Sequence, residues 1–167
     1  MSPDPVFFYQ TAHPFSNFHP SVFTEDGVAY HCAEQYLMAR KAALFGDEAT
    51  RRAILEARTP GECKALGRRV SPYEDARWAA ERFGVALDML RLKFGQNARL
   101  RAALLATGEA ELVEAAPNDR IWGVGFSEQD APGARQAWGE NLLGRALMSV
   151  RAELGGAALH DGPLKFR

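Results

Sequence analysis

The stretch YHCAEQYLMARKAALFGD, residues 30–47, predicts a buried helix that carries one acidic side chain in its first turn. Glu34, Met38, Lys41 and Phe45 recur at helical spacing and share one side, while apolar residues cover much of the remaining circumference. A carboxylate on such a helix must be hydrogen-bonded or have a raised pKa. Glu34 therefore has two interpretations. It is either a cap or solvent-facing glutamate of its own helix, or a tuned general acid or nucleophile.

The patterns on either side of this stretch predict a mainly helical α+β domain with a few short strands near the N-terminus. Residues 6–9 form an apolar strand candidate, and the turn signal at 25–27 predicts a hairpin. Asp47 and Thr59 are the expected N-caps of the two helices that follow the opening stretch. Helices are predicted over residues 32–45, 46–57, 59–69, 78–96, 98–108 and about 140–154.

The whole chain, residues 1–167, is predicted to be one domain with a core over about 6–154 and a loosely held tail over 155–167. Residues 111–144 are polar and glycine-rich, which is typical of a long functional or disordered loop. The large apolar side chains inside this segment, such as Trp122, favour an ordered, functional loop.

Composition limits the class of protein. The chain is 47% hydrophobic and 25% charged, as soluble globular proteins are. Its net charge of −1 gives no overall basic field that would attract duplex nucleic acid. Cys32 and Cys63 have no metal-binding spacing, so we expect reduced thiols. The sequence has neither a signal-peptide pattern nor an apolar run of membrane-spanning length, which predicts a cytoplasmic protein that does not enter a membrane.

A second acid lies in PNDRIWGVG, residues 117–125. Asp119 is either an ordinary turn aspartate or a catalytic partner of Glu34. Trp122, followed by Gly123 and a second glycine, is typical of a platform on which a ligand stacks close to the backbone. We therefore predict Trp122 and Gly123 as substrate-binding residues.

The loop HPFSNF, residues 13–18, offers Asn17 as a hydrogen-bonding group and Phe18 as an aromatic wall, although its rings could equally fill the core. The histidines in and after this loop match no zinc-site spacing, so no metal is predicted.

Six basic residues lie on or beside the predicted helices, and most such charges are expected to be solvated: Arg40, Lys41, Arg68, Arg69, Arg91 and Lys93. Lys41 and Arg68 are the candidate phosphate contacts. The sequence contains neither a P-loop nor a dinucleotide-binding glycine motif. Two carboxylates, aromatic rings and a few cations suit cleavage of a ribose–base bond, because its transition state is an oxocarbenium-like cation.

Six segments in order resemble the NADAR family of YbiA-like N-glycosidases, also called riboflavin biosynthesis intermediate N-glycosidases. The segments begin PFSNFHPSVF, DGVAYHCAEQYLMARK, LGRRV, Trp78, LKFGQNARL and WGENLLGRAL, and they cover about residues 6–154. The resemblance implies hydrolysis of N-glycosidic bonds in ribosyl phosphates, including early riboflavin intermediates, without a cofactor or metal. It also implies two alternatives: removal of ADP-ribose from guanine in nucleic acid, or a non-catalytic ADP-ribose or nucleotide sensor.

By position, Glu34 matches the family's essential glutamate, and Asp119 and Trp122 match its NDxxWG motif. Trp78 matches a mid-chain tryptophan that would wall the pocket or stack on the base, and Asn17 and Phe18 match its N-terminal SNF. The chain departs from the family pattern at Gln35 and Arg40 beside Glu34, and the segment 127–137 has weak correspondence. The expected ligand is a small ribosyl phosphate or an ADP-ribose-type compound, and nucleic acid is expected only as an ADP-ribosylated substrate.

Overall fold

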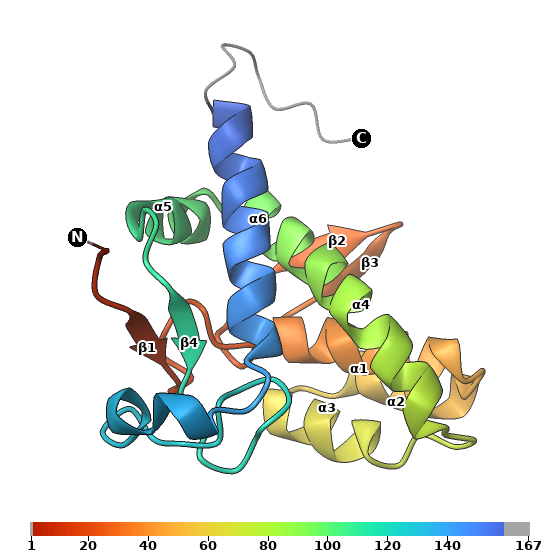
Figure 1. The fold of residues 1–167 in the computed structure, drawn as a ribbon. Coiled ribbons are helices and arrows are strands. Elements are labelled where there is room, and N and C mark those ends of the chain that lie inside the picture. The colour runs from red at the N-terminus through yellow and green to blue at the C-terminus, as the bar shows by residue number, and fades with distance from the viewer. Residues whose placement is uncertain (1, 159–167) are drawn as a thin grey trace. The chain divides into compact units, whose positions relative to one another are not determined.

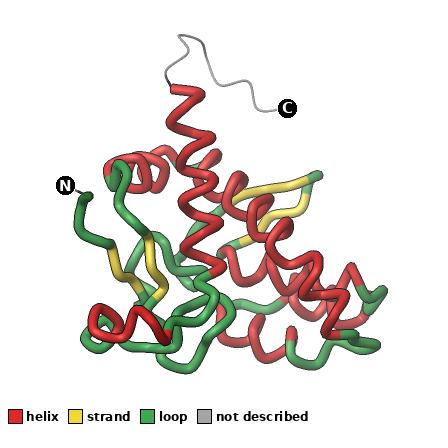
Figure 2. Tube along the Cα trace, in the orientation of Figure 1, coloured by secondary structure: helices red, strands yellow, loops and turns green. Residues whose placement is uncertain are grey.

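The computed structural model describes residues 2–158, and it has the mainly helical α+β architecture that the sequence predicts (Figure 1). Its strands are short, as Figure 2 shows. The contacts divide the chain into two compact units. One contains residues 17–97, and the other contains the described parts of residues 1–16 and 98–167.

The first unit, residues 17–97, starts with a hairpin and continues with four helices. Strands β2 (Phe23–Glu25) and β3 (Val28–Tyr30) pair antiparallel, as the turn signal predicts. The turn residues Asp26 and Gly27 have φ values of 50° and 80°, which is the left-handed conformation that tight hairpin turns require. The helices are α1 (Ala33–Leu44), α2 (Glu48–Glu56), α3 (Pro60–Gly67) and α4 (Asp75–Gln96).

Local signals explain where two of these helices begin. The Asp47 carboxylate accepts a hydrogen bond from the Thr50 amide at 3.1 Å, and the Thr59 hydroxyl accepts one from the Glu62 amide at 3.2 Å. Both predicted N-caps are therefore confirmed. Helix α4 begins at Asp75, three residues before its predicted start.

Helix α1 is the central element of this unit. It packs against α2, α3 and α4, and eight of its twelve residues are buried. The apolar circumference that the sequence shows is therefore covered by other helices, which confirms the prediction of an interior helix.

The second unit contains a parallel strand pair that the sequence analysis missed. Strand β1 (Val6–Phe8) was predicted, and it pairs with β4 (Leu112–Glu114), which lies inside the supposed long loop. The prediction of one continuous loop over 111–144 is therefore wrong. A 3₁₀ helix, η1 (Ala131–Ala137), also lies in this segment, and α5 (Ala98–Ala106) and α6 (Leu142–Ala158) complete the unit.

Helix α6 packs against β4 and α5. It includes residues 155–158, which the sequence analysis assigned to a tail, and residues 159–167 lie outside the described part. The amides of residues 140–143 donate to the carbonyls of residues 120–123 at 2.7 to 3.2 Å. The segment that follows Asp119 is therefore ordered against the start of α6. None of the helices described in residues 2–158 has the length and apolar character needed to cross a bilayer.

Candidate active site

Glu34 is the second residue of α1, and only 7% of its surface is exposed. Its backbone amide donates to the carbonyl oxygen of Asn17 at 2.9 Å, which joins the first turn of α1 to the SNF loop. The burial excludes a solvent-facing glutamate. A buried carboxylate requires polar or charged neighbours, because transfer of an isolated charge out of water is costly.

Lys41 lies two turns further along the same face of α1. Its ammonium donates to the carbonyl oxygen of Gly67 at 2.9 Å and lies 4.8 Å from the ring centre of Tyr73. Burial lowers the pKa of Lys41, the charges of Glu34 and Asp75 raise it, and the charge of Arg68 lowers it. Three residues predicted from the sequence, Glu34, Lys41 and Arg68, are therefore close enough to interact electrostatically.

Gly67 at the end of α3 makes this arrangement possible. A Cβ atom at this position would lie 2.0 Å from the sulfur of Met38, which is on the same face of α1 as Glu34. Any larger residue at this position would force the Met38 side chain to move. This close approach places the Gly67 carbonyl within hydrogen-bonding distance of the Lys41 ammonium. Arg68, which follows Gly67 in the sequence, is exposed to solvent.

Tyr73 and Arg77 extend this face, and the sequence analysis missed both. The rings of Phe45 and Tyr73 lie 5.2 Å apart between centres, and the guanidinium of Arg77 lies 5.7 Å from the centre of the Phe45 ring. We call Glu34, Lys41, Phe45, Arg68 and Tyr73 the Glu34 face. Tyr73 lies in a loop between helices, where no periodic pattern indicates a role for it. Its position five residues before Trp78, a predicted substrate-binding residue, was the one sequence signal that could have pointed to it.

Asn17 provides an unused acceptor next to Glu34. Its backbone oxygen is bonded to the Glu34 amide, whereas its buried side-chain oxygen has no hydrogen-bond partner among residues 2–158. Buried polar atoms are nearly always paired in native proteins, so this unpaired oxygen is a candidate acceptor for a hydrogen bond from a ligand or a water molecule.

Phe18 and Trp78 belong to the same unit. Phe18 is half-buried, and the Lys64 ammonium lies 5.8 Å from its ring centre. Trp78 is buried near the start of α4. Their roles in substrate binding stay predictions.

Gln35 and Arg40, the departures from the family pattern beside Glu34, are both engaged in structural contacts. The Gln35 side chain accepts from the His31 amide at 2.9 Å and donates to the Ile54 carbonyl at 3.0 Å. Arg40 donates to Asp88 of α4 at 3.1 Å and to the Tyr36 hydroxyl.

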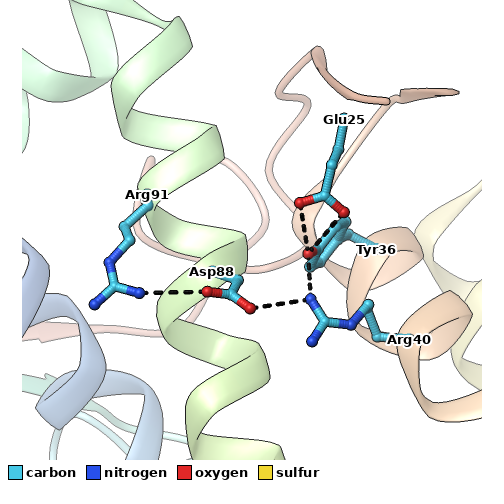
Figure 3. Close-up of polar contacts among 5 residues, drawn as sticks. All are labelled: Glu25, Tyr36, Arg40, Asp88 and Arg91. Atoms are coloured by element: carbon cyan, nitrogen blue, oxygen red, sulfur yellow. Dashed lines mark hydrogen bonds and ion pairs between the residues drawn. The ribbon is translucent and has the colours of Figure 1, made fainter. Parts of the chain in front are cut away.

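Figure 3 shows the resulting network, in which Arg40 reaches from α1 to Asp88. Asp88 also pairs with Arg91 at 3.3 Å, and the Tyr36 hydroxyl bonds to Glu25 of β2 at 3.2 Å. Arg40 is therefore part of a contact that joins α1, α4 and the hairpin, unlike most basic residues on helix surfaces.

Asp119, Trp122 and Gly123 lie in the second unit. One carboxylate oxygen of Asp119 accepts the amides of Ile121 and Trp122, both at 2.9 Å, which is the turn arrangement expected of an ordinary turn aspartate. A Cβ atom on Gly123 would lie 2.8 Å from the Glu114 carbonyl oxygen, so packing against β4 explains this glycine. The catalytic role of Asp119 and the ligand contacts of Trp122 and Gly123 stay predictions. Across residues 2–158, no three side chains of the metal-binding types gather into a site.

A family comparison agrees with the resemblance seen in the sequence. The model of the NADAR domain matches residues 7–155. The chain belongs to the NADAR domain family. Among NADAR relatives, an N-glycosidase of Acanthamoeba polyphaga mimivirus is 41% identical over 148 residues, which are 84% of this chain and 87% of the relative.

Two further NADAR relatives extend the comparison. N-glycosidase YbiA of Escherichia coli K12 is 36% identical over 150 residues, 88% of this chain and 86% of YbiA. The NMR structure of E. coli YbiA superposes with a TM-score of 0.78 at 32% identity, covering 99% of this chain and 94% of YbiA. A riboflavin biosynthesis protein of Vibrio vulnificus is 34% identical over 153 residues, 90% of this chain but 38% of that longer protein.

Proposed function

We propose that this NADAR protein hydrolyses the N-glycosidic bond of a ribosyl phosphate, releasing a base and ribose 5-phosphate, with Glu34 as the central carboxylate. The N-glycosidase relatives match most of the chain at 36% and 41% identity, so the chain is a hydrolase of N-glycosyl bonds. The riboflavin biosynthesis relative supports early riboflavin intermediates as the substrate class.

The observation that carries the proposal is the burial of Glu34 within electrostatic reach of Lys41. Departure of the base leaves positive charge on the anomeric carbon of the ribose. A fixed carboxylate in a site shielded from water stabilises this charge more strongly than solvent does. Glu34 meets this requirement, because α1 holds its backbone in the middle of the helical core and Asn17 anchors its amide.

The rest of the Glu34 face suits the other parts of such a substrate. Lys41 and Arg68 offer two positive charges for the phosphate, and the Gly67 carbonyl holds the Lys41 ammonium in place. The unpaired side-chain oxygen of Asn17 can accept a hydrogen bond from a ribose hydroxyl or an exocyclic amine. These contacts would orient the anomeric carbon toward Glu34, and orientation alone supplies much of an enzyme's rate enhancement.

A substrate panel tests the proposal. Early riboflavin intermediates, ADP-ribosyl guanosine and NAD⁺ are incubated with the protein, and free base is quantified by chromatography. We expect base release from the riboflavin intermediates and a loss of at least ~100-fold in turnover for Glu34→Gln, the usual scale for removal of an acid–base group. Glu81 is an exposed glutamate of α4. Glu81→Gln makes the same chemical change away from the Glu34 face, so it is the matched control, and we expect it to keep its activity.

The panel also separates the two alternatives. Cleavage of ADP-ribosyl guanosine alone would replace the riboflavin assignment with ADP-ribose removal. Binding of ADP-ribose without release of base from any compound would overturn catalysis and favour a sensor.

A further inference from the structure

Tyr73 lies in the loop between α3 and α4, and its ring meets the side chain of Lys41. The Lys41 ammonium lies 4.8 Å from the centre of the Tyr73 ring and donates to the Gly67 carbonyl oxygen at 2.9 Å. Gly67 is the last residue of α3, and Tyr73 comes shortly before α4 begins at Asp75. The two contacts therefore hold one cation of α1 against both ends of the loop that follows α3.

The Tyr73 ring is itself held in place. Its centre lies 5.2 Å from that of the Phe45 ring, with 59° between the two planes. Its hydroxyl donates to the Asp75 carboxylate at 2.9 Å, and the amide of Ser71 in the same loop donates to the carboxylate of Asp47 at 2.9 Å. A tyrosine that is 45% exposed could otherwise adopt several side-chain rotamers. These contacts favour the single conformation that the structure shows.

A lysine needs such contacts if its charge is to stay in one place. The ammonium is a compact charge on a flexible four-carbon stem, so binding a ligand costs it side-chain entropy. Burial lowers the pKa of Lys41, which disfavours the charged form. The negative face of an aromatic ring attracts a cation and favours that form. An ammonium has three N–H donors, so one can donate to the Gly67 carbonyl while another donates to a ligand.

We propose that Tyr73 is a positioning residue, whose ring holds the Lys41 ammonium at the Gly67 carbonyl so that the ammonium can donate to the phosphate of the substrate. Tyr73 acts through Lys41 and does not bind the phosphate itself, because its ring carries no positive charge and its hydroxyl donates to Asp75. The role of the phosphate rests on the proposed function, whereas the contact between the ring and the ammonium does not.

Nuclear magnetic resonance tests the contact without any substrate. Protons over the face of an aromatic ring resonate upfield, so we expect an upfield shift of the ε-methylene protons of Lys41, which adjoin its ammonium. Lys41→Met assigns the signal by removing it. Tyr73→Phe keeps the ring and should keep the shift, whereas Tyr73→Leu should move the signal toward that of an exposed lysine. Tyr9→Leu, at another half-exposed tyrosine, is the matched control and should leave the signal unchanged.

Ribose 5-phosphate, a product of the proposed reaction, is the probe for the phosphate. Calorimetric titration measures its Kd, and circular dichroism and the urea midpoint verify that each variant is folded. We expect Tyr73→Leu to raise the Kd by about 3- to 10-fold, the scale of one cation contact, and Tyr73→Phe and Tyr9→Leu to change it by less than about 2-fold. In a chain that already carries Lys41→Met, Tyr73→Leu should have no further effect, because the residue through which Tyr73 acts is gone.

Three results would overturn the inference. The first is a Lys41 signal at the same position in the parent and in Tyr73→Leu. The second is a Kd that Tyr73→Leu leaves unchanged, or that Tyr73→Phe raises equally, which would remove the role of the ring. The third is an equal rise in Kd with and without Lys41, which would show that Tyr73 contacts the ligand directly. A shifted Lys41 signal in a parent chain that neither binds ribose 5-phosphate nor releases base would support the contact and would count against the proposed function instead.

Discussion

Lys93 gives a stability prediction that depends on pH. Its side chain is completely buried, and burial lowers its pKa from the ordinary 10.5 to about 7, although the charge of Cys32 opposes the shift. Between these two pH values the unfolded chain keeps the Lys93 proton and the folded chain loses it. Unfolding therefore takes up a proton in this range, and the folded protein becomes more stable as pH rises from 7 to 10.5.

The magnitude follows from the pKa. At 1.36 kcal/mol for each pH unit, the cost of burying Lys93 falls by about 3 to 4 kcal/mol between pH 7 and pH 10. Lys93→Met removes this titration and keeps a long apolar side chain. We expect Lys93→Met to unfold with a free energy higher than that of the parent at pH 7, and the difference to shrink by about 3 to 4 kcal/mol by pH 10.

Urea denaturation followed by circular dichroism across pH 7 to 10 measures this difference. Both proteins carry Cys32→Ser, so that the neighbouring thiol does not titrate in the same range. Lys64→Met, at an exposed lysine of α3, is the matched control and should show no pH-dependent difference. A Lys93→Met difference that stays constant from pH 7 to 10 would show that Lys93 does not lose its proton in this range on folding.

Three further substitutions test the packing and the charges of the site. Gly67→Ala should destabilise the fold by about 1 to 3 kcal/mol in urea denaturation, because its methyl group has no room, whereas Gly61→Ala, which meets nothing within 4 Å, should not. Arg68→Ala should raise KM about 10-fold for a ribosyl phosphate but should leave KM for the dephosphorylated compound unchanged. Arg69→Ala is the control and should leave both KM values unchanged. An equal rise in KM for both compounds would show that Arg68 does not bind the phosphate. Asp119→Asn keeps a side-chain oxygen that can accept the amides of Ile121 and Trp122, so the turn should survive. A loss of turnover with unchanged thermal stability would indicate that Asp119 has a catalytic role. Full activity would indicate that Asp119 only stabilises the turn.

The elements that the sequence predicted are those specified by neighbouring residues. Asp47 and Thr59 cap the helices that follow them, and the turn residues Asp26 and Gly27 adopt the backbone conformation that a hairpin needs. Strand β4 was missed because its partner β1 lies about a hundred positions earlier, and three residues of strand carry no pattern of their own.

For the candidate site, too, the sequence predicted what depends on a single helix but not what depends on the packing between helices. The burial of Glu34 follows from the apolar circumference of α1, which the sequence displays. The proximity of Arg68 to Lys41 and the burial of Lys93 depend on how α1, α3 and α4 pack. A lysine on the core-facing side of a helix usually extends its charge to solvent, so the sequence favoured a solvated Lys93.

Turnover of an early riboflavin intermediate by Glu34→Gln is the most direct test of the central claim. The substitution keeps the size of the side chain and removes its charge, and circular dichroism and the urea midpoint verify that the fold is retained. The proposed role of Glu34 predicts a loss of at least ~100-fold in base release. A folded Glu34→Gln protein that releases base at the parental rate would contradict it.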